Sequence, residues 1–200
     1  MNASPYLSNA GEFLVTLVFE IYLLAVMLRF LLQTVRADFN NPVSQLLIKV
    51  TNPPLRYLRR WIPGYGGIDW PSILLLFVLK AIELALIALI KTGALPAPAG
   101  HVLLSIAHLL KLVVWIYIVI ILIQVIISWL NPGAYSPVTI LMNQLTRPLL
   151  NPIRRTVPPT GGLDWSPLIA LIFLNLVLIL LIAPLQDYGN LLAGYNMRLL

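Results

Sequence analysis

The 200-residue sequence contains no cysteine, which excludes disulfide bonds and thiolate metal sites. Its two histidines, His101 and His108, have neither cysteine nor carboxylate beside them in the sequence, so they make a poor metal site. The phosphate-binding glycine patterns, the HExxH helix and the GxSxG turn are also missing. These absences predict a protein that is not an enzyme and has no cofactor, no metal and no evident small-molecule substrate.

Charge is scarce as well. Only 10% of the residues are charged, whereas a soluble domain usually has about 25%. Hydrophobic residues make up 60%, and the mean hydropathy is +0.90. Apolar runs near 13–35, 71–91, 108–130 and 167–186 are each long enough to cross roughly 30 Å of hydrocarbon. The sequence therefore predicts an all-α membrane protein with four transmembrane helices.

The sequence also contains an internal repeat. Residues 42–70 align with residues 137–165 without a gap, and 13 of these 29 positions are identical. The identical positions are mostly prolines, glycines, charges and aromatics, which apolar drift would not reproduce. We expect two parallel repeats, 1–95 and 96–200, each with the order helix, interfacial proline-rich segment, helix.

Basic residues indicate the orientation of these repeats. Eight of the 13 lysines and arginines lie between the first and second spans or between the third and fourth. By the positive-inside rule, both interfacial segments are expected in the cytoplasm and both termini outside it. We interpret the net charge of +6 as a feature of membrane topology. Nucleic acid is an unfavoured partner, because it generally requires a larger basic face.

Each interfacial segment is expected to begin with a short amphipathic helix, at 42–51 and at 137–146, whose apolar stripe rests at the headgroup boundary. The prolines that follow are expected to prevent a continuous helix and to favour extended or turn geometry. These prolines are Pro53, Pro54, Pro63, Pro148, Pro152, Pro158 and Pro159.

Three sets of residues are candidates for a structural or binding role, and the first two recur in both repeats. The glycine pairs allow tight turns, and the aspartates that follow occupy the N-cap position of the next span. These turn and cap candidates are Gly66, Gly67, Asp69, Gly161, Gly162 and Asp164. Arginine pairs and interfacial tryptophans are expected to contact anionic lipid headgroups, a protein partner, or both. These contact candidates are Arg59, Arg60, Trp70, Arg154, Arg155 and Trp165.

Polar side chains inside the spans form the third set: Glu20, Arg29, Lys80, Glu83, Gln124 and Asn175. Under the repeat alignment, Arg29 corresponds to Gln124 and Lys80 to Asn175, so both halves place polar groups at the same two depths. This pattern predicts a polar seam between helices, serving either packing or the passage of an ion or solute. Lys80 and Glu83 can pair on one helix face. Arg29 lies near the end of its span, where it can extend to the interface without a partner.

The repeated core resembles the YggT family of bacterial integral membrane proteins, which is related to YlmG-type proteins. The resemblance rests on T-x-P-x-L, on P-I-R-R at Pro152–Arg155, and above all on G-G-[IL]-D-W in both halves, and it covers residues 13–186. The first copy departs from the pattern, with Leu55-Arg56-Tyr57 where the second has Leu150-Asn151-Pro152. The resemblance implies a multi-pass protein of the bacterial inner (plasma) membrane without an established enzymatic activity. Family associations include osmotic or potassium-related stress tolerance, cell division, nucleoid organisation and cytochrome-complex assembly.

Three functional hypotheses follow. The first is a non-enzymatic inner-membrane scaffold or assembly factor that supports osmotic stress tolerance and whose two cytoplasmic segments contact lipid and a partner. The alternative is an oligomeric ion channel or transport component for potassium or osmotic homeostasis, with the polar seam as its route. The third hypothesis is that the basic face tethers the nucleoid to the membrane. A protein partner and a homo-oligomer both remain open.

Overall fold

The computed structural model describes residues 5–131, 133, 135–157 and 164–194. Every regular element in these residues is helical. The elements are α1 (Pro5–Thr34), α2 (Pro42–Trp61), α3 (Trp70–Thr92), α4 (Pro98–Leu130), α5 (Pro137–Thr156), α6 (Ser166–Val177), the π-helical turn η1 (Leu178–Ile182) and α7 (Ala183–Ala193). The candidate membrane spans are Tyr6–Thr34, Trp70–Thr92, Pro98–Leu130 and Ser166–Ala193. The chain is an all-α, multi-pass membrane protein, as predicted.

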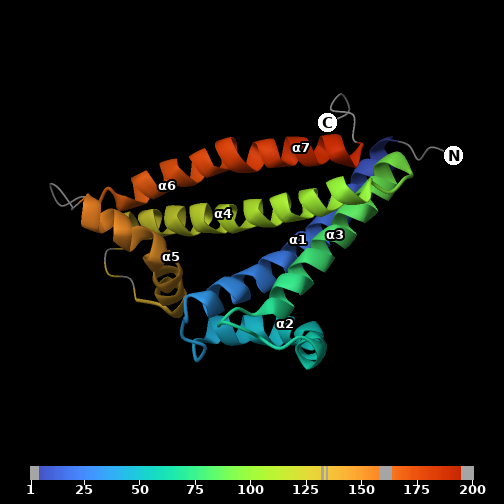
Figure 1. Ribbon diagram of the computed structural model, residues 1–200. Coiled ribbons are helices and arrows are strands. Elements are labelled where there is room, and N and C mark those ends of the chain that lie inside the picture. Colours follow the sequence, from blue (N-terminus) through green and yellow to red (C-terminus); the bar gives the residue numbers. More distant parts are fainter. Residues whose placement is uncertain (1–4, 132, 134, 158–163, 195–200) are drawn as a thin grey trace.

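The long helices form two pairs (Figure 1). α1 packs along α3, and α4 packs along α6 and α7. α1 and α4 run in the same direction, so the two repeats are parallel. The pairs lie close together where α3 is joined to α4, and they diverge toward the other end of the molecule (Figure 1). We call that other end the interfacial end and define it by α2, α5 and the loops that lead from them into α3 and α6.

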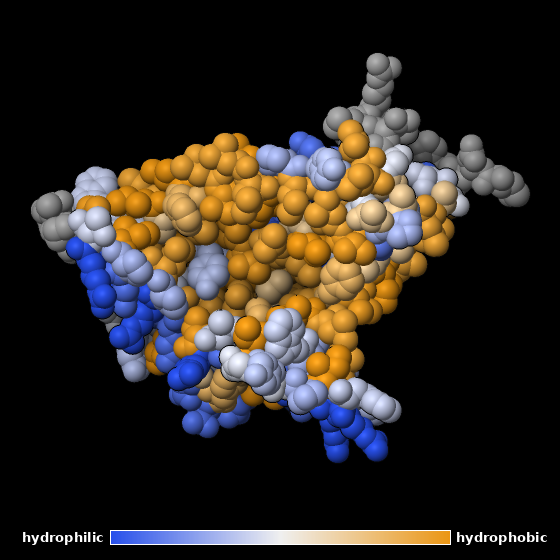
Figure 2. All heavy atoms as spheres, in the orientation of Figure 1, coloured by the Kyte–Doolittle hydropathy of each residue, from blue (hydrophilic) through white to orange (hydrophobic). Residues whose placement is uncertain are grey.

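Hydropathy follows this arrangement. Figure 2 shows apolar atoms over the long helices and hydrophilic atoms gathered at the interfacial end, on α2 and α5. Large apolar side chains such as Phe13 and Leu180 are more than half exposed, with exposed fractions of 64% and 71%. Such exposure is unfavourable in water and favourable against lipid tails, so the outer surface of the long helices is the surface that faces the bilayer.

The spans are longer than hydropathy alone indicated. α1 begins at Pro5 rather than near residue 13, α4 begins at Pro98 rather than near 108, and the last span continues to Ala193. Apolar runs underestimate helices whose first turns contain polar groups that find partners. In α1, Glu12 pairs with Lys91 of α3 at 2.7 Å, so the helix continues beyond its apolar segment.

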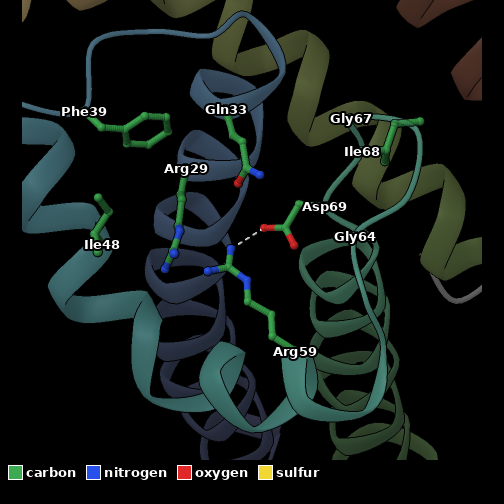
Figure 3. Close-up of a pocket in the computed structure, with 9 residues that line it drawn as sticks. All are labelled: Arg29, Gln33, Phe39, Ile48, Arg59, Gly64, Gly67, Ile68 and Asp69. Atoms are coloured by element: carbon green, nitrogen blue, oxygen red, sulfur yellow. Dashed lines mark hydrogen bonds and ion pairs between the residues drawn. The ribbon is translucent and has the colours of Figure 1, made fainter.

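The expectation that prolines break the interfacial segments is wrong for the first prolines of each segment. It holds at Pro63, which follows the end of α2, and Pro158 and Pro159 lie outside the described residues. α2 runs through Pro53 and Pro54, and α5 runs through Pro148 and Pro152, although α2 bends along its length (Figures 1 and 3). An internal proline costs about 3 kcal/mol, because it removes a hydrogen bond and crowds the preceding turn. Burial of the apolar side chains that follow Pro54 and Pro148 contributes to offsetting this cost: Leu55 and Leu150 are 0% and 4% exposed.

The last span accommodates a proline in another way. Pro184 lies just after η1, at the beginning of α7. The N–H of Ala183 bonds the carbonyl of Leu178, five residues earlier, instead of the usual four. This wider turn releases the helix from the bond that proline cannot make and keeps the span continuous.

Candidate functional site

An arginine–aspartate ion pair recurs at the interfacial end of both repeats. Arg59 Nη2 lies 2.6 Å from Asp69 Oδ2, and Arg154 Nε lies 2.9 Å from Asp164 Oδ2. Each pair joins the last turn of an interfacial helix to the beginning of the next span. The first arginine of each arginine pair therefore closes a loop within the chain, which sequence analysis had not distinguished from the second.

The two aspartates differ in detail from simple helix caps. Asp69 occupies the N-cap position of α3, but its carboxylate accepts from Arg59 and from the Ser72 hydroxyl at 2.7 Å, not from a backbone N–H. Asp164 precedes the N-cap residue of α6, which is Trp165, and its Oδ1 accepts the Ser166 N–H at 2.9 Å. Burial alone would raise the pKa of Asp164, but hydrogen bonds from Ser166 and the charge of Arg154 outweigh it, so this pKa lies below its ordinary value.

The loop before α3 turns at its glycines. Gly66 and Gly67 have φ values of 67° and 78°, in the left-handed region that favours glycine. The Tyr65 carbonyl accepts the Ile68 N–H at 3.3 Å and the Trp70 indole N–H at 3.2 Å, which holds the turn against α3. Gly161 and Gly162, the corresponding pair, lie outside the described residues.

A second recurring contact joins the first helix of each repeat to its interfacial helix. Arg29 Nη1 donates to Thr51 Oγ1 at 2.8 Å, and Gln124 Oε1 accepts from the Thr146 hydroxyl at 3.1 Å. Arg29 is only 5% exposed, so the expectation that it extends to the interface without a partner is wrong. Sequence analysis missed both threonines as functional candidates, although their identity in the repeat alignment was an available signal.

The predicted seam divides into separate groups. Lys80 Nζ lies 2.6 Å from Glu20 Oε1 and 2.9 Å from Glu83 Oε2, which forms a charged triad between α1 and α3. Arg29 and Gln124 instead bond the interfacial helices. The exposed Asn175 amide donates to the Leu171 carbonyl of its own helix at 2.8 Å. The six residues therefore do not line one continuous route.

Hydrogen bonds also join the two repeats at the interfacial end. The Asn41 side chain donates to the Pro137 carbonyl at 2.7 Å, and Gln144 Oε1 accepts the Asp38 N–H at 3.1 Å. Sequence analysis missed these residues. Comparing one repeat with the other does not reveal contacts made between them.

A pocket of about 570 Å³ opens beside the first Arg–Asp pair (Figure 3). α1, α2 and the loop before α3 supply its walls. Arg29 and Arg59 point their guanidinium groups toward each other in it, while Asp69 approaches Arg59 from the other side (Figure 3). The lining also includes Gln33, Phe39, Ile48, Gly64, Gly67 and Ile68.

All four arginines of the two pairs are exposed, but the second arginine of each pair differs from the first in its partners. Arg60 and Arg155 are exposed, and no ion pair joins either of them to a carboxylate in the part of the chain that the structure describes. On α5, Arg147 and Arg155 line a surface hollow of about 590 Å³. The two interfacial tryptophans of the prediction, Trp70 and Trp165, are each somewhat less than half exposed, at 45% and 42%.

Comparison with known proteins agrees with the repeated architecture. The family model described as CCB3/YggT matches residues 8–90 and again residues 103–185. An uncharacterised Pseudomonas aeruginosa protein is 40% identical over 177 residues, which cover 88% of this chain and 90% of that protein. A Vibrio alginolyticus protein, described only as encoded in the proC 3′ region, is 38% identical over 168 residues, or 84% of this chain and 90% of its own.

Escherichia coli K12 has a further relative, the uncharacterised protein YggT. It is 35% identical over 184 residues, which cover 92% of this chain and 95% of that protein. No solved structure matches the chain. Two matches to one family model, together with relatives that align over nearly the whole length, show that this chain belongs to the CCB3/YggT family.

Proposed function

We propose that the chain is a non-enzymatic scaffold of the bacterial inner membrane, which holds an acidic partner protein against the membrane surface with the exposed arginines of α2 and α5. The observation that carries this proposal is the different use of the two arginines in each pair. Arg59 and Arg154 pair with aspartates within the chain, while no ion pair joins Arg60 or Arg155 to a carboxylate in the described residues. The same division occurs in both repeats, so the chain presents two matched basic positions.

Helical geometry extends the basic surface on α2. Lys49, Arg56 and Arg60 are all exposed, and their spacings of seven and four residues place them along one side of the helix. On α5, Arg147 and Arg155 flank the surface hollow. Basic side chains at the headgroup boundary attract anionic lipid at about 1 kcal/mol each, and they also fit carboxylates of an acidic partner.

The proposal takes the orientation of the protein in the membrane from the positive-inside rule. The interfacial end has most of the basic residues and is placed in the cytoplasm, so the partner is a cytoplasmic protein or the cytoplasmic part of another membrane protein. The hydrogen bonds that Asn41 donates to Pro137 and that Gln144 accepts from Asp38 across the two repeats support a scaffold role, because they fix the spacing between the two basic surfaces.

The proposal is tested by photo-crosslinking in intact membranes. A photoreactive residue at Tyr57, which is 75% exposed on α2, reports any protein that contacts this surface. We expect a discrete crosslinked product in the parent protein and its loss in the Arg60→Gln/Arg155→Gln double variant. Arg36→Gln, which removes an exposed charge outside both helices, serves as the matched control and should retain the product. Identical products in the parent and the double variant, at equal membrane levels, would contradict the proposal.

The transport alternative draws less support from the geometry. Its charged candidates in mid-span, Lys80, Glu20 and Glu83, pair with one another, and Asn175 bonds its own helix. A liposome flux assay under a potassium gradient tests it directly. Flux that is lost in a folded Lys80→Leu/Glu20→Gln/Glu83→Gln variant would favour transport, whereas no flux from folded wild-type protein would exclude conduction by the purified chain.

A further inference from the structure

Arg29 is a buried cation without a carboxylate partner. All seven aspartates and glutamates of the chain lie in described residues, and none of them forms an ion pair with Arg29. The hydrogen bonds that the guanidinium donates go to neutral groups, Thr51 Oγ1 at 2.8 Å and Asn52 Oδ1 at 3.5 Å. A buried charge is expensive unless an opposite charge accompanies it, so the site is electrostatically incomplete.

The pocket beside Arg29 increases this excess of positive charge. Arg59 directs its guanidinium group toward Arg29, and Asp69 is the only acidic side chain in the lining (Figure 3). Asp69 lies within ion-pair distance of Arg59 and not of Arg29. Two arginines against one carboxylate leave the pocket with a formal charge of +1. Two cations that face each other across a cavity are an arrangement that an anion between them would stabilise.

The second repeat shows the same position without the charge. Gln124 replaces Arg29, and it bonds Thr146 in the way that Arg29 bonds Thr51. Its amide group also donates to Asn143 Oδ1 at 2.8 Å, so both polar ends of the glutamine have partners. A neutral side chain is thus sufficient to join the first helix of a repeat to its interfacial helix. The positive charge of Arg29 is therefore an addition in the first repeat that this contact does not require.

We propose that the pocket formed by α1, α2 and the loop before α3 binds a phosphate-group anion between Arg29 and Arg59. Guanidinium groups match phosphate oxygens with paired N–H donors, and Arg29 keeps donors beyond those that bond Thr51 and Asn52. Gly64 and Gly67 in the lining have no side chains that would keep an anion from the loop backbone. The inference deepens the proposed function and rests on its placement of α2 at the headgroup boundary.

Two sources supply this chemistry: the headgroup of an anionic phospholipid and free inorganic phosphate. The position of Arg29 near the end of α1, at the interfacial end, places the pocket where a lipid phosphate lies. A cavity of about 570 Å³ accommodates either a phosphate or a small headgroup.

Binding to the purified full-length protein in detergent tests the inference. Short-chain phosphatidylglycerol, short-chain phosphatidylcholine and inorganic phosphate are titrated separately, and affinity is measured by isothermal titration calorimetry. We expect phosphatidylglycerol or inorganic phosphate to bind, with the tighter of the two identifying the source, and phosphatidylcholine to bind at least tenfold more weakly. Arg29→Gln, the substitution that the second repeat already contains, should weaken anion binding by about tenfold or more.

Two further variants keep the test decisive. Gln33→Glu retains Arg29 but places a carboxylate in the pocket wall, so it should also abolish anion binding. Asn175→Leu, in α6 of the second repeat and outside both the pocket and the basic surfaces, should leave the affinity unchanged. Equal binding of anionic and zwitterionic lipid with no phosphate binding, or wild-type affinity in both pocket variants, would overturn the inference. No partner protein is present in this assay, so its outcome is independent of the crosslinking result at Tyr57.

Discussion

The two repeats share their interfacial contacts and differ in their intramembrane charges. Both contain an Arg–Asp pair at the loop, 59 with 69 and 154 with 164, and both join the first helix to a threonine of the interfacial helix. The first repeat alone has the triad of Lys80, Glu20 and Glu83. In the second repeat the corresponding positions are neutral: Asn175, Trp115 and Leu178.

This difference separates what the architecture requires from what one repeat adds. A helix–interfacial segment–helix unit folds around the loop pair and the threonine contact, because the second repeat has both without a counterpart of the triad. The charges of the triad cost desolvation energy in hydrocarbon, and the second helix pair has no counterpart of this triad. The first repeat is therefore the specialised one, and substitutions at corresponding positions should have unequal effects.

The largest difference in stability between substitutions at corresponding positions of the two repeats is expected within the spans. Lys80→Leu removes the only cation of the triad and leaves Glu83, whose side chain is 2% exposed, unpaired. We expect a loss of about 4 kcal/mol in the free energy of unfolding, measured in mixed micelles. The corresponding Asn175→Leu should change it by about 0.5 kcal/mol or less, because Asn175 is exposed and bonds only its own helix.

A compensated variant sharpens this test. Glu20→Gln and Glu83→Gln, added to Lys80→Leu, remove the charges that the single variant leaves unpaired, so most of the stability should return. If Lys80→Leu changed the free energy of unfolding as little as Asn175→Leu, the triad would not contribute to stability and the proposed specialisation of the first repeat would be wrong.

The two helix pairs also differ in how closely the helices within each pair pack at a glycine. A Cβ added to Gly100 of α4 would overlap the backbone of Ala193 in α7, whereas one added to Gly11 of α1 would meet Ile90 side-chain atoms of α3 at an ordinary 3.7 Å. We therefore expect Gly100→Ala to destabilise by about 3 kcal/mol, since backbone atoms cannot rotate away. Gly11→Ala should be neutral or should stabilise by up to about 1 kcal/mol. Thermal unfolding of the two variants side by side measures the contrast, and equal shifts would contradict it.

A smaller difference in stability is expected between substitutions at the two recurring Arg–Asp ion pairs. Asp69 has a side chain that is 4% exposed, against 33% for Asp164. Arg59→Gln leaves a buried carboxylate with only the Ser72 hydroxyl and should cost about 2 kcal/mol. Arg154→Gln weakens a more exposed pair and should cost about 1 kcal/mol or less. Limited proteolysis checks the same difference when cleavage of the loop before α3 in Arg59→Gln is compared with cleavage of the loop before α6 in Arg154→Gln. Faster cleavage in Arg154→Gln than in Arg59→Gln would contradict it.

Much of the fold could be predicted from particular residues. The alignment of 42–70 with 137–165 and the four apolar runs specify two parallel repeats, because a bilayer imposes its thickness on every span. The extent of the interfacial helices was not predictable from Pro53 and Pro148. Local rules favour a break there, whereas burial of Leu55 and Leu150 on the far side of the prolines keeps the helix intact.

For the candidate site, the sequence predicted which residues are candidates but not how they are arranged. Sequence placed Arg29, Arg59 and Asp69 among the candidates but put them in different sets, and it did not indicate that a pocket joins them. It also treated Arg59 and Arg60 alike. One helical position, a rotation of about 100°, decides which of the two reaches Asp69 and which faces outward.

The sequence by itself determined that the protein lies in a lipid bilayer, how many spans it has and that its two repeats are parallel. Hydropathy and repetition can be recognised from the order of the residues alone. Only the tertiary structure decided that Lys80 meets Glu20, that Arg29 lies buried against Thr51, and that six polar residues form separate groups instead of one seam. Which polar groups meet depends on how each helix is rotated and shifted against its neighbours. Many apolar contacts along the helix set that rotation together, and no local pattern encodes it.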